Sequence, residues 1–164
     1  MKIKIKPKKI NKKNFSKFGQ IIDTSKNKYF RINNGYAKRY DNLGKIDTST
    51  KKGKTIVSIF SAKKRKFPMK VEMMEKHPLG SQAFVPMKET SFLVFVAPKG
   101  NKPDLNKIES FKIPKQTGIN LNPGIWHFPL ISTKDMNFLV IDRKGKGNNL
   151  IIHKFRKEQI YLSQ

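Results

Sequence analysis

Short segments with the pattern of β-strands recur along this chain at intervals of roughly ten residues, with Gly, Pro and Asn between them. Residues 3–6 and 69–73 alternate apolar and polar side chains, whereas residues 91–97 are almost continuously apolar. Alternation is typical of a strand with one buried face, and a continuous apolar run indicates a strand buried on both faces. The chain is therefore expected to fold as an all-β sandwich or barrel.

The same pattern places most of the remaining elements. Asn11 is expected to cap a short N-terminal helix that carries Phe15 and Phe18 on one face and ends at Gly19. The tail at 155–162 suggests a helical turn, and Asn33-Asn34-Gly35 a tight turn, because Asn and Gly tolerate positive φ. Further strands are predicted at residues 20–22, 29–32, 55–60, 109–113, 118–121, 137–141 and 150–154.

Size and composition favour one domain over residues 1–164. A chain of this length, 37% apolar and with 12 Phe, can build a single core. It contains no run of 18 apolar residues that would span a membrane, and its lysine-rich start lacks the apolar region of a secretory signal. Because there is no cysteine, disulfides and thiolate ligands are excluded. A cytoplasmic protein without membrane partners is expected.

The formal charge of +25 raises the question of nucleic-acid binding. However, only five of the 36 basic residues are Arg, the residue that reads bases and clamps phosphates with a bidentate fork. The lysines are spread over the whole length, and the aromatic residues lie mostly in apolar strands instead of alternating with basic ones. We interpret the charge as a solvated lysine surface and expect no nucleic-acid partner.

Two segments rich in Gly and Pro each contain one of the three histidines. The first runs through residues 75–87 and holds His77; the second, residues 122–130, holds His127. Cupin-type double-stranded β-helix proteins carry two comparable motifs, the second with a Pro-Gly turn and a His three residues after the Gly. Gly124 and His127 fit that second motif directly, whereas Glu75, His77 and Gln82 fit the first in altered form.

These four residues suggest a metal site. Residues 75 and 77 share one face of a strand, and His127 would come from an adjoining strand. Two imidazoles with the oxygens of Glu75 and Gln82 form a set that suits nickel, manganese or iron better than tetrahedral zinc. The alternative is that both histidines are turn residues bonded to the backbone.

Read together, several blocks resemble the ureidoglycolate lyase family. The blocks lie at residues 30–35, 39–40, 58–59, 77–87, 92–97, 102–105, 126–130 and 141–143. The resemblance implies a cupin-like double-stranded β-helix (jelly-roll barrel), a homodimer, an association with nickel, and cleavage of ureidoglycolate to glyoxylate and urea. One departure is Ser61, which stands where the family usually has Arg; Arg65 lies four residues further on.

That reaction requires a base, an acid, a cation for the carboxylate and polar groups for the urea end. His77 and His127 are the candidates for base, acid or metal ligand, with Lys88 as a further acid or charge partner. Arg39 and Arg143 are the candidates for the carboxylate, unless each forms a structural ion pair. Asn33 and Gln82 complete the candidates for substrate binding. A different cupin-type enzyme and, less favoured, a basic nucleic-acid-binding barrel remain the alternatives.

Overall fold

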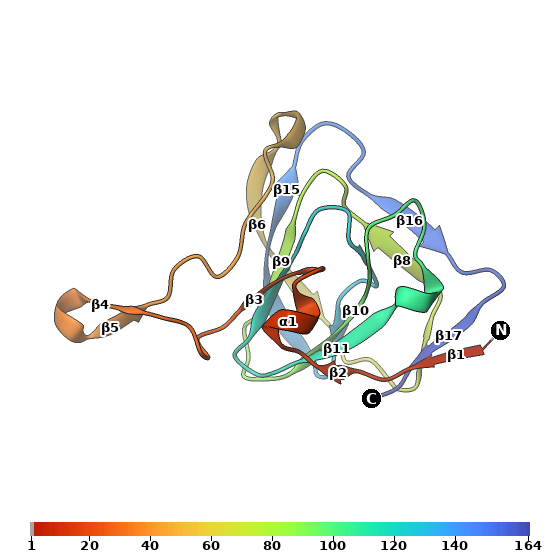
Figure 1. Cartoon of the computed structure of the whole chain (residues 1–164), viewed down its shortest axis with the longest axis horizontal. Helices are drawn as coiled ribbons and strands as arrows, with labels where there is room; N and C mark the ends of the chain where they lie inside the picture. The colour runs from red at the N-terminus through yellow and green to blue at the C-terminus, as the bar shows by residue number, and fades with distance from the viewer. Residues whose placement is uncertain (1) are drawn as a thin grey trace.

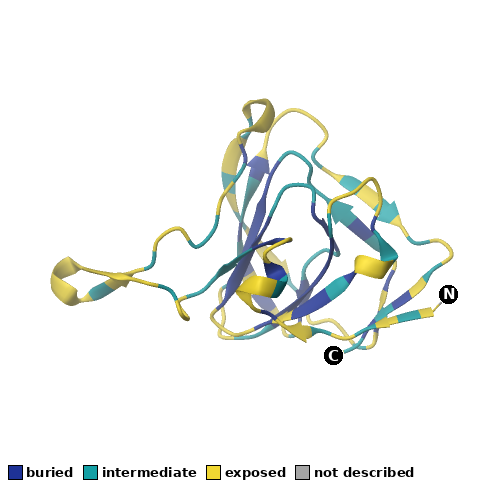
Figure 2. Cartoon of the chain, in the orientation of Figure 1, coloured by how far each residue is buried: buried dark blue, intermediate teal, exposed yellow. Residues whose placement is uncertain are grey.

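The computed structural model describes residues 2–164, and two β-sheets facing each other enclose its main core (Figure 1). Inward side chains of the two sheets interdigitate there, among them Phe84, Phe138 and Val140 from one sheet and Phe92 and Phe111 from the other. The expected all-β, cupin-like barrel is confirmed. In Figure 2 the buried residues follow the strands at the centre of this arrangement.

Each sheet joins strands that are distant in sequence. The five-stranded sheet has the order β3 (Gly19–Ile22), β12 (Gly118–Leu121), β9 (Gln82–Pro86), β15 (Met136–Lys144) and β6 (Lys54–Ala62). The seven-stranded sheet has the order β16 (Ile151–Lys154), β8 (Met73–Lys76), β13 (Trp126–His127), β10 (Phe92–Ala97), β11 (Glu109–Ile113) and β2 (Lys8–Lys9), with β14 (Ile131–Ser132) also paired to β10.

A third layer explains why β10 is apolar on both faces. One face of β10 points into the barrel, while Leu93, Phe95 and Ala97 on its other face belong to a second core cluster. That cluster is closed by the three-stranded sheet β1 (Lys2–Ile5), β17 (Gln159–Leu162) and β7 (Met69–Val71). All six residues of β10 are consequently buried.

The N-terminal helix forms where the sequence predicts it. The side chain of Asn11 accepts a hydrogen bond from the Asn14 backbone, the Asn14 side chain accepts one from the Asn11 backbone, and this capping box starts α1 (Lys12–Phe15). Phe15 and Phe18 are fully buried against Phe111. No helix among the described residues is long and apolar enough to cross a bilayer.

A separate two-stranded hairpin, β4 (Phe30–Ile32) and β5 (Ala37–Arg39), projects away from the barrel (Figure 1). Its turn is the predicted Asn33-Asn34-Gly35 segment, in which all three residues have positive φ. We call residues 29–40 the arm.

The sequence pattern missed several short strands and misassigned the tail. β2, β5, β9, β13 and β14 were not predicted, because two to five residues give too little periodicity to recognise. The predicted helical turn at 155–162 is wrong, since β17 pairs in parallel with β1 there. The alternation of buried Ile160 and Leu162 with less buried neighbours fits a strand.

An ion-pair group holds the N-terminal segment to the barrel. Glu109 accepts a hydrogen bond from Lys8 at 2.9 Å and pairs also with Lys17. Burial opposes the charge of this carboxylate, but the two lysines outweigh burial and lower the pKa of Glu109 from its ordinary value of 4.5. A lowered pKa stabilises the fold above pH 4.5, and that contribution is lost as the pH falls below it.

We therefore expect Glu109→Gln to lower the free energy of unfolding by roughly 1 kcal/mol near neutral pH. The difference from the unsubstituted protein should shrink as the pH falls below 4.5, where the wild-type carboxylate also becomes neutral. Urea unfolding between pH 3 and 7 measures it. Glu72→Gln, which removes an exposed pair with Lys70, is the matched control and should have little effect. A pH-independent loss would contradict the ion-pair explanation.

Candidate active site

Two neighbouring strands of the seven-stranded sheet bring the two predicted histidines together. His127 on β13 is the direct cross-strand partner of Glu75 on β8. His77 follows β8 immediately, two residues beyond Glu75, so that side-chain alternation turns both toward the same space. We call Glu75, His77 and His127 the histidine–glutamate cluster.

The cluster is close enough to act as one site. The imidazole centroids of His77 and His127 lie 5.2 Å apart. One oxygen of Glu75, Oε1, lies 3.5 Å from His127 Nε2 and 3.7 Å from His77 Nε2. One potential ligand atom from each of the three residues lies within 4.8 Å of the others. Donor atoms about 2.1 Å from a shared ion are about 3 to 4 Å apart, so the spacing fits a common metal.

Hydrogen bonds to the backbone fix the orientation of both rings. His77 Nδ1 lies 2.7 Å from the carbonyl oxygen of Asn149, and His127 Nδ1 lies 3.0 Å from that of Ile125. A carbonyl can only accept, so each Nδ1 carries the proton and donates it. In the neutral rings this leaves the lone pair on Nε2, and both Nε2 atoms are buried without a hydrogen-bond partner. Such a pair of Nε2 atoms is prepared for a metal or a proton.

Electrostatic interactions within the cluster shift the pKa values of Glu75 and His77. Burial alone would raise the pKa of Glu75, but His127 and His77 beside it outweigh burial and lower the pKa to about 2. Burial would correspondingly lower the pKa of His77, but Glu75 and the Asn149 carbonyl outweigh it, so that the pKa of His77 is raised above 6.5. Glu75 is therefore ionised at neutral pH, and its negative charge favours a positive charge, from a proton or a metal, beside it.

A cavity of about 330 Å³ opens beside the cluster. Glu75, Gln82 and Phe84 form its inner wall, and Phe60, Ser61 and Pro129 are among the residues at its rim. Gln82 is 6% exposed; its Nε2 donates to Asp142 Oδ2 at 3.2 Å, and its Oε1 has no partner. Gln82, which was predicted to bind substrate or metal, thus faces the cavity with one acceptor atom, Oε1, that has no hydrogen-bond partner.

The structure does not bring the other predicted site residues to the cluster. Arg143 is buried, and its guanidinium donates to the carbonyl oxygens of Thr50 and Lys146. Lys88 is exposed and donates to the carbonyl of Asp135 at 3.3 Å. Asn33 and Arg39 belong to the arm.

Sequence reasoning did not identify Asp142 as part of this site. Its Oδ1 is buried without a partner, and its Oδ2 accepts from Gln82. Asp142 alternates with Val140 and Phe138 along β15, which place their side chains in the core. This alternation was the signal that could have found it. The third histidine, His153, packs on Trp126 and Phe155 away from the cluster, as expected for a structural residue.

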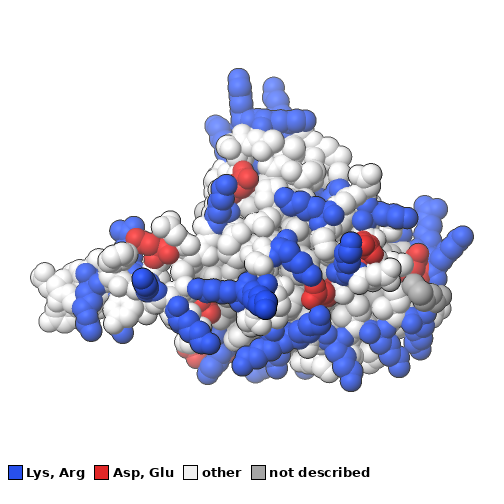
Figure 3. Space-filling view, in the orientation of Figure 1, with Lys and Arg blue, Asp and Glu red and all other residues white. Residues whose placement is uncertain are grey.

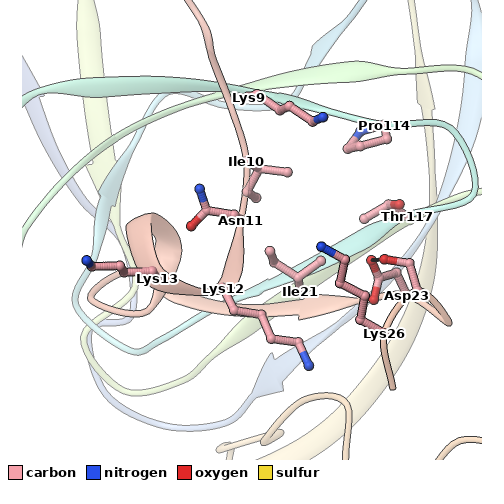
Figure 4. A pocket seen from close by; sticks show the side chains of 11 residues that line it. Lys9, Ile10, Asn11, Lys12, Lys13, Ile21, Asp23, Lys26, Pro114 and Thr117 are labelled. Atoms are coloured by element: carbon pink, nitrogen blue, oxygen red, sulfur yellow. Dashed lines mark hydrogen bonds between the residues drawn. The ribbon is translucent and has the colours of Figure 1, made fainter. Parts of the chain in front are cut away.

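Another hollow, of about 680 Å³, lies near α1 and β3 (Figure 4). Lys9, Lys12, Lys13 and Lys26 surround it, and Lys12 donates to Asn27 Oδ1 at 2.6 Å. No residue of the histidine–glutamate cluster lines it, whereas Glu75 lines the smaller cavity. On the face shown in Figure 3, lysines cover the barrel and the arm alike, with a few acidic side chains among them. The lysines around this hollow therefore do not indicate a particular ligand.

A cupin-like barrel with two histidines around a glutamate that lines a cavity is typical of small-molecule enzymes and metal sites. Comparison with known proteins narrows this class. The model of the ureidoglycolate lyase family matches residues 2–162, and the chain belongs to that family.

Curated relatives named ureidoglycolate lyase match over nearly their full length. The protein of Pseudomonas aeruginosa strain LESB58 is 41% identical over 161 residues, covering 98% of this chain and 94% of its own. Those of Pseudomonas putida strain F1 and Pseudomonas entomophila strain L48 are each 40% identical over 154 residues, covering 93% of this chain and 92% of their own.

Proposed function

We propose that this protein is a lyase that cleaves ureidoglycolate to glyoxylate and urea. The observation that carries the proposal is the histidine–glutamate cluster, with two unpartnered Nε2 atoms beside a cavity, in a chain of the ureidoglycolate lyase family. The test is the release of both glyoxylate and urea from ureidoglycolate by the purified protein. Release of neither, by a folded and metal-supplemented protein, would contradict it.

The reaction consumes no water. The central carbon of ureidoglycolate carries a carboxylate, a hydroxyl and a urea nitrogen. When the hydroxyl loses its proton, its electrons form the carbonyl of glyoxylate, the carbon–nitrogen bond breaks, and the urea nitrogen takes up a proton. The protein must therefore stabilise the developing oxyanion and supply a proton to the leaving nitrogen.

The residues around the cavity suit these tasks. When no metal ion occupies it, the unused Gln82 Oε1 can accept a hydrogen bond from a urea N–H. Phe60 and Phe84, whose rings meet edge to face 6.4 Å apart, limit the access of water. Backbone hydrogen bonds at Nδ1 keep His77 and His127 oriented with Nε2 toward the reacting groups.

We further propose that Glu75, His77 and His127 hold a divalent metal ion, with Gln82 Oε1 as a fourth ligand. Both Nε2 atoms and Gln82 Oε1 have no hydrogen-bond partner, and Glu75 offers a carboxylate oxygen within 4.8 Å of the histidine donors. Two nitrogens and two oxygens suit such an ion. Family resemblance suggests nickel. Such an ion, when bound, supplies the positive charge that lowers the pKa of the substrate hydroxyl.

Elemental analysis tests the metal proposal without relying on activity. We expect about one divalent ion per chain after dialysis against a mixture of nickel, manganese and iron salts, and much less for Glu75→Gln, because a buried site needs its full ligand set. His153→Gln is the control and should retain the wild-type content. If the dialysed protein contains no ion yet cleaves ureidoglycolate at full rate, the histidines act by proton transfer alone.

The proposal also includes a homodimer and a cytoplasmic location. Apolar side chains left exposed on the barrel and on the arm support association with a second copy. A cysteine-free chain has no need of an oxidising compartment.

A further inference from the structure

The arm exposes apolar side chains that nothing in the chain covers. Phe30 is 62% exposed, Ile32 43% and Tyr36 89%. No residue of the arm belongs to either core cluster, and β4 and β5 pair only with each other. An isolated two-stranded hairpin is marginally stable in water, and a contiguous exposed apolar face usually marks an interface.

The two faces of the arm differ in chemistry. Cross-strand pairing of Phe30 with Arg39 and of Ile32 with Ala37 puts these four side chains on one face. The opposite face carries Arg31 and Lys38, which are also paired, next to the rings of Tyr29 and Tyr40, whose centroids lie 5.5 Å apart. The apolar face thus contains a single charged group, the Arg39 guanidinium.

A matching apolar surface lies on the outer face of the five-stranded sheet. Val57 and Ile59 on β6 are 65% and 51% exposed. Their cross-strand partners on β15, Ile141 and Leu139, are partly exposed on the same face. β6 is the edge strand of this sheet, and Phe60 and Ser61, which follow Ile59, line the rim of the cavity. Whatever covers Val57 and Ile59 therefore reaches the cavity mouth.

Among the described residues, the lining of the cavity offers no basic side chain to the carboxylate of the proposed substrate. Across the described residues 2–164, no Lys or Arg lines it, whereas Glu75 does and Asp142 lies directly behind Gln82. Two acidic groups close to the cavity offset part of the positive charge that the proposed metal ion would supply, so a guanidinium at the rim would strengthen binding of the carboxylate. Arg143, the buried arginine nearest in the sequence, is bonded to backbone carbonyls.

We propose that the arm docks on the β6 face of a second copy of this chain and that its Arg39 completes the partner's active site by binding the substrate carboxylate. The inference rests on the proposed function and adds a residue supplied across the interface. It places Phe30 and Ile32 on Val57 and Ile59 of the second copy, with Arg39 at the rim formed by Phe60 and Ser61.

The local geometry of Arg39 suits this role. Its Nε donates to Asp41 Oδ1 at 2.6 Å, which orients the guanidinium and leaves the edge formed by the two Nη groups for another carboxylate. The side chain is 64% exposed in the single chain. Docking would bury it, and a guanidinium binds a carboxylate more strongly when water is excluded.

Complementation between two impaired variants, assayed at a substrate concentration well below the KM of Arg39→Ala, tests the proposal. Arg39→Ala has intact histidines and a defective arm, whereas His127→Ala has an intact arm and a defective cluster. A heterodimer of the two, purified through different tags, contains one complete site if Arg39 acts across the interface, so we expect about half of the wild-type activity by symmetry. If Arg39 acts within its own chain, the heterodimer has no complete site, and a heterodimer that is no more active than the Arg39→Ala homodimer overturns the proposal.

The KM values of the single variants provide the reference for that experiment. Arg39→Ala should raise KM for ureidoglycolate at least about tenfold, because a bidentate charged contact is lost, whereas Arg31→Ala on the opposite face should leave KM nearly unchanged. An Arg39→Ala variant with wild-type KM would overturn the proposal. Arg39→Lys should recover part of the affinity, since the charge remains and the fork is lost.

Sedimentation separates failure of this inference from failure of the lyase assignment. The wild-type chain should sediment as a dimer, and a variant with Phe30→Ser and Ile32→Ser as a monomer of unchanged circular dichroism. This outcome supports docking of the arm even if no lyase activity is found. A wild-type monomer of 19.0 kDa at micromolar concentration, or a dimer unaffected by the double substitution, overturns the docking.

Discussion

Replacing either His77 or His127 by Ala should reduce the rate of ureidoglycolate cleavage by about 10²- to 10⁴-fold, the usual loss when an acid–base group is removed. The Nε2 atoms of both imidazoles lie close to Glu75 Oε1, that of His127 at 3.5 Å and that of His77 at 3.7 Å. Neither ring has a close substitute among the described residues, because His153 packs on Trp126 and Phe155 elsewhere. The measurement is glyoxylate and urea release at saturating substrate.

The same substitutions should leave the fold intact. Each Nε2 is a buried atom without a hydrogen bond, so its removal also removes an unsatisfied polar group. His153→Ala is the matched control, and its activity should stay close to that of the wild type, since it lies outside the cluster. Circular dichroism verifies folding. If His153→Ala were inactive and the other two variants active, the site would lie elsewhere in the barrel.

Several parts of the fold were readable from the sequence because they depend on local patterns. Phe92 to Ala97 is buried on both faces, as its continuous apolar run predicted, and Asn11 caps α1. The tail was not readable in this way. Its strand β17 exists because β1 and β7 lie on either side of it, and such pairing between distant segments leaves little local trace.

The site was only partly readable for a similar reason. Spacing along one strand placed Glu75 and His77 on a common face, and the Gly-Pro context pointed to His127. The presence of an arginine in the sequence does not indicate which groups its guanidinium will contact in the folded protein. Arg143 is held by the carbonyl of Lys146, which is three residues on, and by that of Thr50, which is 93 residues away in the sequence. Arg39 extends on the arm.

Arg143→Met should destabilise the protein by about 2–4 kcal/mol, because three hydrogen bonds from a buried guanidinium would be lost. Its Nε and Nη2 donate to the carbonyl of Thr50 at 3.1 and 2.8 Å, and Nη2 donates to that of Lys146 at 2.8 Å. These bonds join the loop before β6 to the loop after β15. Without Arg143, both carbonyls lose a charged donor in a place where Arg143 is only 7% exposed.

Urea unfolding measures this loss, and the KM for ureidoglycolate decides between two roles of Arg143. If it is structural, the folded variant keeps its KM at low temperature while the midpoint of unfolding falls. If instead it binds the substrate carboxylate, KM rises and stability changes little. Arg156→Met, at an exposed arginine, is the matched control and should change stability by no more than about 0.5 kcal/mol. A structural result leaves the lining of the cavity, among the described residues, without a basic side chain for the substrate carboxylate, which is the group that Arg39 of a second copy would supply.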